Sequence, residues 1–326
     1  MLNIPRALGA VAVGCSLLLV AACGTAGEPG SAQPGQLKVV TAFYPLQFVA
    51  ERVAGQHGAV SSLTQPGAEP HDVELTPRQV ASVSDGDAVI YIKGFQPAMD
   101  EAVAQSGNEH VLDTTSVVPL QTEAEEHAHD HADDSPAEEH SDEDHAEEGH
   151  DHGGLDPHVW LNPLNMVTIT DAVVAQLSGI DPDHAADYRA NGAALQAELK
   201  KLDGSYAAGL KTCDRQEFIT SHAAFGYLAE QYGLTQIGIS GLTPDAEPSP
   251  ARIAAVQEEA KAHGVTTIFY ETLVSPAVAT SIAGDLGLTT DVLDPIEAVT
   301  AESRGDNYIA VMQSNLVALE KANGCR

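Results

Sequence analysis

Short apolar segments alternate with helical ones along most of this chain, and this alternation restricts its fold more than any other feature. The expected strands are 37–42, 60–63, 88–92, 111–113, 217–220, 235–239, 267–270 and 290–293. The expected helices are 45–53, 76–83, 96–104, 223–232, 251–263, 276–286 and 307–322. Alternation of this kind predicts an α/β protein with two lobes, each built on a parallel four-stranded sheet.

A long helical segment lies between the two groups of strands. After a first helix from Asn162 to about Leu177, a second is expected over 183–210, with apolar residues spaced three, four or seven apart on one face. At 1.5 Å per residue such a helix spans about 40 Å. We therefore expect a rigid helix that joins an N-terminal lobe, 37–182, to a C-terminal lobe, 211–326.

Residues 121–153 differ in composition from the rest of the chain. This 33-residue stretch has fourteen Asp or Glu, no Lys or Arg, and seven histidines: His127, His129, His131, His140, His145, His150 and His152. It offers almost nothing apolar to bury, so we expect a disordered loop. Many imidazoles and carboxylates together are typical of weak, multi-site binding of divalent cations.

The charge balance excludes one class of partner. With 15 Lys and Arg against 47 Asp and Glu, the formal net charge is -32, which repels phosphate backbones and argues against nucleic-acid binding. A mean hydropathy of -0.10 excludes a polytopic membrane protein. An acidic chain with 14 histidines favours cations as ligands.

The N-terminus predicts export and lipid anchoring. Residues 1–22 resemble a signal peptide: Arg6 precedes a short apolar run, which ends in small residues before Cys23. That ending is similar to a bacterial lipobox, which predicts lipidation of Cys23 and a flexible tether over 23–36. We expect the protein on the outer face of the cytoplasmic membrane; cleavage of an ordinary signal near Ala22 is the alternative.

Two cysteines remain in the mature chain. Cys15 lies in the signal and Cys23 is the lipidation site, which leaves Cys213 and Cys325. A pair of cysteines in an exported protein favours a disulfide, although two separate thiols are the alternative.

Three histidines and an aspartate lie where a cation site is expected. His71 follows the second expected strand, His222 ends the fifth, and Asp294 ends the last, while His158 lies directly before a helix. Ligands of open α/β sheets gather at the carboxyl ends of strands. Three imidazoles and a carboxylate match the ligand set of zinc. The histidines at 57, 110, 184 and 263 lack this placement and are expected at the surface.

Several motifs carry a family resemblance over nearly the whole mature chain. PGAEPHDVELTPRQ, DPHVWLNP, TSHAAFGYLAEQYGL, GLTPDAEPSPARI and FYET are similar to those of zinc-specific (ZnuA-like) solute-binding lipoproteins of bacterial ABC importers. The resemblance implies two α/β lobes joined by a long rigid helix, with the metal in the cleft between them. It implies His71, His158 and His222 as ligands and Asp294 as the fourth.

The fourth ligand stays open at the level of sequence. Some zinc-specific relatives have a glutamate directly before the first ligand histidine, but Pro70 stands there in this chain. Glu69, one residue further back, is therefore a weaker candidate, and a water is another. Glu271 also ends a strand and is a candidate for a residue that supports a ligand.

The predicted function is capture of Zn²⁺ outside the membrane and delivery to an importer permease and its ATPase by a monomeric, non-enzymatic protein. A manganese site would carry more oxygen ligands, whereas three imidazoles favour zinc; nickel and cobalt remain alternatives. A metal-buffering surface protein or adhesin is a further alternative. A zinc hydrolase is disfavoured because the HExxH motif is missing from the sequence.

Overall fold

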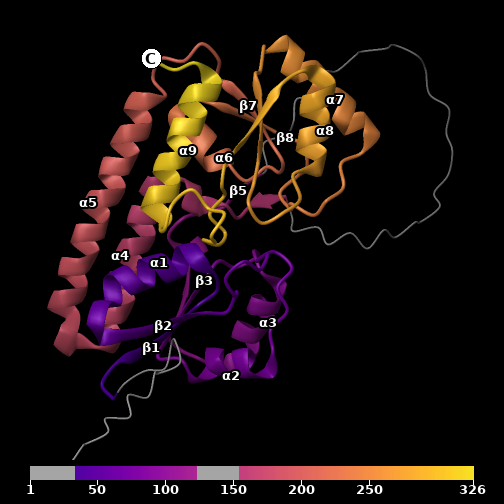
Figure 1. Cartoon of the computed structure of the whole chain (residues 1–326). Coiled ribbons are helices and arrows are strands. Elements are labelled where there is room, and N and C mark those ends of the chain that lie inside the picture. The colour runs from indigo at the N-terminus through magenta and orange to yellow at the C-terminus, as the bar shows by residue number, and fades with distance from the viewer. Residues whose placement is uncertain (1–33, 123–153) are drawn as a thin grey trace, which may run out of the picture.

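The computed structural model describes residues 34–122 and 154–326, which form two α/β lobes, one above the other in Figure 1. The predicted signal peptide, Cys23, most of the tether and the seven histidines of the acidic stretch lie outside the described residues. Within the described residues, none of the helices combines the length and apolar character that crossing a membrane requires.

The first lobe is built on a parallel sheet in the order β2-β1-β3-β4. Its strands are β1 (Leu37–Thr41), β2 (Gly58–Ser62), β3 (Ala88–Tyr91) and β4 (Val111–Asp113), and its helices are α1 (Tyr44–Ala54), α2 (Pro77–Asp85) and α3 (Pro97–Ser106). A side-chain cap begins α2, because the Thr76 side chain accepts from the Gln79 backbone N–H.

The second lobe repeats this arrangement. Its parallel sheet has the order β10-β9-β7-β8, so in both lobes the first strand lies between the second and the third, and the fourth forms an edge. The strands are β7 (Glu217–Thr220), β8 (Thr235–Gly238), β9 (Thr267–Tyr270) and β10 (Thr289–Val292). The helices are α6 (Gly226–Tyr232), α7 (Pro250–Ala262), α8 (Ala277–Leu286) and α9 (Tyr308–Asn323).

Two long helices run along one side of both lobes (Figure 1). α4 (Pro163–Ile180) packs against α5 (Ala185–Gly209), and α5 also contacts α1 of the first lobe and α9 of the second. The predicted connecting helix is thus confirmed, with one difference at its start: Pro182–His184 forms a separate 3-10 turn. The two lobes and their parallel four-stranded sheets are as predicted.

A small hairpin was missed by the sequence prediction. β5 (Gln121–Thr122) pairs antiparallel with β6 (Leu155–Asp156), and a 3-10 turn at Val159–Leu161 follows. The strands have two residues each, which is too short to produce a periodic pattern. β5 lies between the two lobes (Figure 1), so this hairpin is part of the junction between them.

The apolar interior is divided unequally. One large cluster joins the first lobe to α4, α5 and α9, with Trp160, Tyr188 and Tyr206 fully buried in it. A smaller cluster fills the second lobe between its sheet and helices α7 and α8. The predicted disulfide between Cys213 and Cys325 is present, and it joins the segment after α5 to the segment after α9.

Candidate metal site

Three histidines from distant parts of the sequence meet at the junction of the lobes. His71 lies in the loop between β2 and α2, His158 directly precedes the Val159–Leu161 turn, and His222 follows β7. Their rings are neighbours: the ring centroid of His158 lies 5.4 Å from that of His71 and 5.3 Å from that of His222. The structure therefore brings together the three histidines that the sequence singles out.

The acidic residue beside them is Glu297. Its Oε1 atom lies 3.3 Å from Nε2 of His71 and 3.6 Å from Nε2 of both His158 and His222. One ligand atom from each of the four side chains lies within 4.8 Å of the other three. Four such atoms around one small volume can hold a single cation with only slight adjustment of the side chains.

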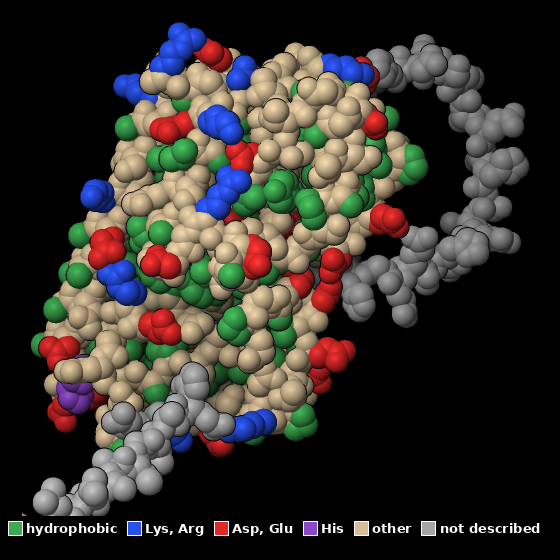
Figure 2. All heavy atoms as spheres, viewed as in Figure 1, with side chains coloured by type: hydrophobic (Ala, Val, Ile, Leu, Met, Phe, Trp, Pro, Cys, Tyr) green, Lys and Arg blue, Asp and Glu red, His purple; other side chains and the backbone are tan. Residues whose placement is uncertain are grey.

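The four side chains are withdrawn from solvent. His71 is 5% exposed, His222 is 1% exposed, and His158 and Glu297 are fully buried. On the face drawn in Figure 2, the described residues show the histidine colour only near the lower end of the first lobe and not where the lobes meet. Nε2 of His158, Nε2 of His222 and Oε2 of Glu297 have no hydrogen-bond partner. Buried polar atoms are nearly always bonded, so three unpartnered atoms on these neighbouring side chains support a ligand at this site.

Two carboxylates orient two of the rings through their other nitrogen. Oδ1 of Asp156 lies 2.7 Å from Nδ1 of His158, and Oε1 of Glu271 lies 2.7 Å from Nδ1 of His222. Each contact fixes the ring so that Nε2 faces the site, which is the arrangement that carboxylates give to metal-binding histidines. Glu271 also accepts from the Ser221 hydroxyl at 2.7 Å.

The protonation of the site follows from burial opposed by charge. Burial lowers the pKa of His222, but the carboxylates of Glu271 and Glu297 outweigh it and raise that pKa to about 10. For His158, hydrogen bonds with Asp156 and Glu297 likewise outweigh burial and raise the pKa. Burial dominates at His71 and lowers its pKa. Burial raises the pKa of Glu297, but its three histidine contacts hold it well below its usual range.

Asp294 does not face this cluster. Its carboxylate accepts from the Ile296 backbone N–H at 2.8 Å and from the hydroxyls of Ser303 at 2.9 Å and Thr272 at 3.3 Å. The structure therefore places Glu297, three residues further on, where the sequence analysis expected Asp294. The short Asp side chain is used to build the turn that carries the longer Glu side chain to the histidines.

That turn is conformationally restrained. Ile296, between the two acids, has φ +60°, the only positive φ among the non-glycine residues that the structure describes, and its side chain is fully buried. A β-branched residue in this region is strained and needs support from its surroundings. The sequence shows only a run of small and apolar residues around Glu297, so the strained turn that selects it was not visible there.

Glu69 lies beside the cluster without joining it. Its Oε1 accepts from the His71 backbone N–H at 3.0 Å, and its Oε2 is buried without a partner. Burial, together with the nearby Glu297 carboxylate, raises the pKa of Glu69 to about 9. The carboxyl group is therefore protonated at neutral pH in the metal-free protein.

The remaining described histidines lie elsewhere. His57 and His184 stack on each other with ring centroids 3.9 Å apart, and His263 contacts Glu217 at 3.2 Å. His110 is exposed. None of these belongs to the His71–His158–His222–Glu297 group within the part of the chain that the structure describes.

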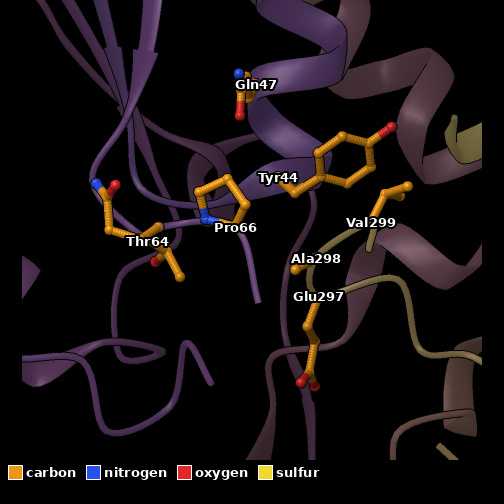
Figure 3. A pocket seen from close by; sticks show the side chains of 8 residues that line it. Tyr44, Gln47, Thr64, Pro66, Glu297, Ala298 and Val299 are labelled. Carbon is orange, nitrogen blue, oxygen red and sulfur yellow. The ribbon is translucent and has the colours of Figure 1, made fainter. Parts of the chain in front are cut away.

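A small cavity of about 40 Å³ lies between the lobes next to Glu297. It is lined by the start of α1, the loop after β2 and the loop after β10, and it is large enough for a water molecule. Figure 3 shows the Glu297 carboxylate extending away from the Tyr44 and Pro66 side chains, so the carboxylate is directed out of this cavity.

A two-lobed α/β scaffold with three imidazoles and one carboxylate buried at the junction defines a class of protein that encloses a cation between its lobes. The comparison with known families agrees: the sequence model described as "Zinc-uptake complex component A periplasmic" (ZnuA) matches residues 39–322. The chain belongs to this family.

Curated relatives and solved structures support the assignment. "High-affinity zinc uptake system protein ZnuA" of Bacillus subtilis is 36% identical over 320 residues, covering 96% of each chain. "Zinc-binding lipoprotein AdcA" of Streptococcus pneumoniae is 36% identical over 314 residues, which cover 94% of this chain but 59% of that relative. The Zn(II)-bound ZnuA-like domain of AdcA from Streptococcus pneumoniae superimposes with a TM-score of 0.71 at 34% identity, covering 89% of this chain and 99% of that one. This chain thus spans about three fifths of the AdcA protein that it matches.

Proposed function

We propose that this protein binds Zn²⁺ between its lobes through His71, His158, His222 and Glu297 and delivers it to the permease and ATPase of an ABC importer. The observation that carries the proposal is the convergence of four buried side chains whose ligand atoms lie within 4.8 Å of one another. Glu297 replaces Asp294 as the proposed fourth ligand. Relatives named for zinc uptake and zinc binding support the choice of cargo.

The ligand chemistry also favours zinc. Three imidazole nitrogens and one carboxylate oxygen suit Zn²⁺, whereas Mn²⁺ and Mg²⁺ prefer sites dominated by oxygen. Four protein ligands leave no open position for an activated water, which a zinc hydrolase needs. The site therefore fits a carrier of the ion rather than a catalyst, and the ion is cargo.

The remaining sequence features complete the proposal. Lipidation at Cys23 and a tether over 23–36 would hold a monomeric protein at the outer face of the cytoplasmic membrane. The histidines of 121–153 would bind further zinc ions weakly and pass them to the tight site between the lobes.

Competition with a chromophoric chelator tests the proposal. The chelator removes zinc from weak sites, so we expect one equivalent per chain to resist it, with preference for Zn²⁺ over Mn²⁺. His222→Ala should abolish this equivalent. His263→Ala is the matched control in the same lobe, because His263 is exposed and its ion-pair contact is with Glu217. This variant should leave the tight site intact. Equal retention of zinc by both variants would contradict the proposed site.

A further inference from the structure

The beginning of α6 lies directly against the residue that orients His158. Asp156, on β6, uses Oδ1 to accept from the His158 backbone N–H at 2.8 Å and to contact its ring nitrogen Nδ1 at 2.7 Å. Asp156 is 5% exposed and His158 is fully buried. The direction of the His158 ring therefore depends on where Asp156 is held.

Tyr227 holds the backbone of Asp156. Its hydroxyl donates to the Asp156 carbonyl at 2.9 Å and accepts from the Gln121 backbone N–H at 2.8 Å. Gln121 and Asp156 are paired across the β5–β6 hairpin, so one phenol from the second lobe bridges both strands. Tyr227 is 3% exposed, so its surroundings restrict the position of the hydroxyl.

Gly226 limits the space for the Asp156 side chain. A Cβ atom at residue 226 would lie 2.8 Å from Oδ2 of Asp156, closer than a real Cβ contact. A side chain there would have to push the carboxylate away, and Oδ1 of this carboxylate already contacts the backbone nitrogen and the ring Nδ1 of His158. The glycine therefore allows α6 to approach the carboxylate at the position that His158 requires.

Both contacts come from the segment that also carries a second candidate ligand. His222 precedes Gly226 by four residues, and its own ring is oriented by Glu271. The same stretch of the second lobe thus presents His222 directly and determines the position of His158 through Asp156.

We propose that Gly226 and Tyr227 are positioning residues for zinc binding, which hold Asp156 so that the His158 ring faces the ion. The inference rests on the proposed function. Neither residue touches the ion; both act on it through Asp156 and His158.

Two substitutions test the inference: one removes a hydrogen bond to Asp156, and the other adds a methyl group against its side chain. Tyr227→Phe removes one hydroxyl and keeps the ring, so the zinc dissociation constant should rise about two- to tenfold, the range expected for one hydrogen bond. Gly226→Ala adds one methyl group against the Asp156 carboxylate. The dissociation constant should rise about 10- to 100-fold, as for other disturbed partners of metal-binding histidines.

Matched controls separate positioning from stability. Tyr232→Phe removes a hydroxyl from the same helix, where it contacts Asp203 at 3.1 Å, and Gly284→Ala adds a methyl in α8 with no heavy atom within 4 Å. Both should keep the zinc affinity of the unsubstituted protein. Because the methyl group added in Gly226→Ala also crowds the buried Asp156 carboxylate, the metal-free melting temperature of this variant is measured beside its zinc affinity.

Cobalt(II) gives a readout that a loss of stability alone does not move. With one equivalent of Co²⁺ bound, the visible absorption bands should shift in Tyr227→Phe and Gly226→Ala and stay unchanged in the two controls. If both test variants keep the affinity and the cobalt spectrum of the unsubstituted protein, the inference is wrong. If the unsubstituted protein itself has no tight zinc equivalent, the proposed function fails, and that result is seen before any variant is made.

Discussion

The two lobes share one strand order but contribute differently to the site. The first lobe provides His71 from the loop after β2, a residue whose pKa is lowered by burial. The second lobe provides His222 and Glu297, each held by a network of contacts. A repeated scaffold therefore does not imply repeated chemistry, because the ligands come from loops whose lengths and turns differ between the lobes.

His158 belongs by sequence to the predicted N-terminal lobe, but the turn that follows it is hydrogen-bonded to the second lobe. The neighbouring Trp160 donates from Nε1 to the Pro295 carbonyl at 2.7 Å, and its own carbonyl accepts from the Tyr308 hydroxyl at 2.6 Å. Contacts with the first lobe are aromatic, as with Phe43, whose ring centroid lies 4.7 Å from that of Trp160. Glu297 of the second lobe contacts His71, His158 and His222, so it links the proposed ligands across the junction.

Removing a histidine from either lobe should have the largest effect. His71→Ala and His222→Ala each delete one of four proposed ligands. The zinc affinity should therefore fall by more than the 10- to 100-fold that is typical when a hydrogen-bond partner of a metal ligand is removed. Zinc should also raise the melting temperature of the unsubstituted protein, because it binds only the folded state. Calorimetric melting with and without one equivalent of zinc should show that both variants lose this rise. A full rise in either one would mean that its lobe donates no ligand.

Substitutions of the two acidic residues in the loop after β10, Glu297 and Asp294, should have the next largest effects and should differ from each other. Glu297→Gln removes the proposed anionic ligand and should weaken zinc binding more than tenfold, because charge-assisted contacts are about twice as strong as neutral ones. Asp294→Ala removes the acceptor for Ile296, Ser303 and Thr272, so it should lower the free energy of unfolding by about 1–3 kcal/mol.

Chelator competition and urea unfolding of both variants distinguish the two roles. Asp294→Ala should lose less zinc affinity than Glu297→Gln and more stability. The reverse order would restore Asp294 as the ligand.

The pH dependence should be a smaller effect and should also distinguish the lobes. In the metal-free protein the pKa of His222 is about 10, so this ring is protonated at neutral pH and must release its proton when zinc binds. Zinc affinity should therefore rise with pH from 7 to 9, about tenfold per unit for each proton released. His71, whose pKa is lowered, releases no proton in this range.

Titration calorimetry in buffers of different ionisation enthalpy counts the protons released. About one proton or more per zinc is expected at pH 7.5, and zero would contradict protonation of His222. The same raised pKa stabilises the metal-free fold fully below about pH 6.5, the ordinary value for histidine, and this contribution is lost as the pH rises through about 10.

Reduction of the disulfide should affect zinc binding least. The bridge spans 112 residues of the second lobe, and in the chain-entropy model a loop of that size contributes up to about 4–5 kcal/mol. Reduction, or Cys213→Ser with Cys325→Ser, should lower the melting temperature by about 10 °C. Zinc affinity should stay nearly unchanged, because neither cysteine contacts the ligands or the residues that orient them. A large loss of affinity would show that the end of α9 controls the site.

The fold was predictable from the sequence because its elements are local. Short apolar strands and the helices between them each produce a pattern within a few residues of the chain. The hairpin β5–β6 was missed because two residues per strand give no period.

The candidate site was predictable for histidines and not for the acid. Histidines are rare enough outside the acidic stretch that their place at strand ends singles out three of them. Carboxylates are common in this chain, and the choice between Asp294 and Glu297 depends on a strained φ at Ile296 and on three hydrogen bonds to Asp294. Such tertiary geometry leaves no pattern in the sequence.

Anomalous diffraction from zinc-loaded crystals tests the central claim most directly. A site shared by the lobes predicts a strong zinc peak at the junction, about 2.0–2.2 Å from Nε2 of His71, His158 and His222 and from a Glu297 oxygen. A peak bound by residues of one lobe alone, or one that includes Asp294 and leaves Glu297 free, would contradict it.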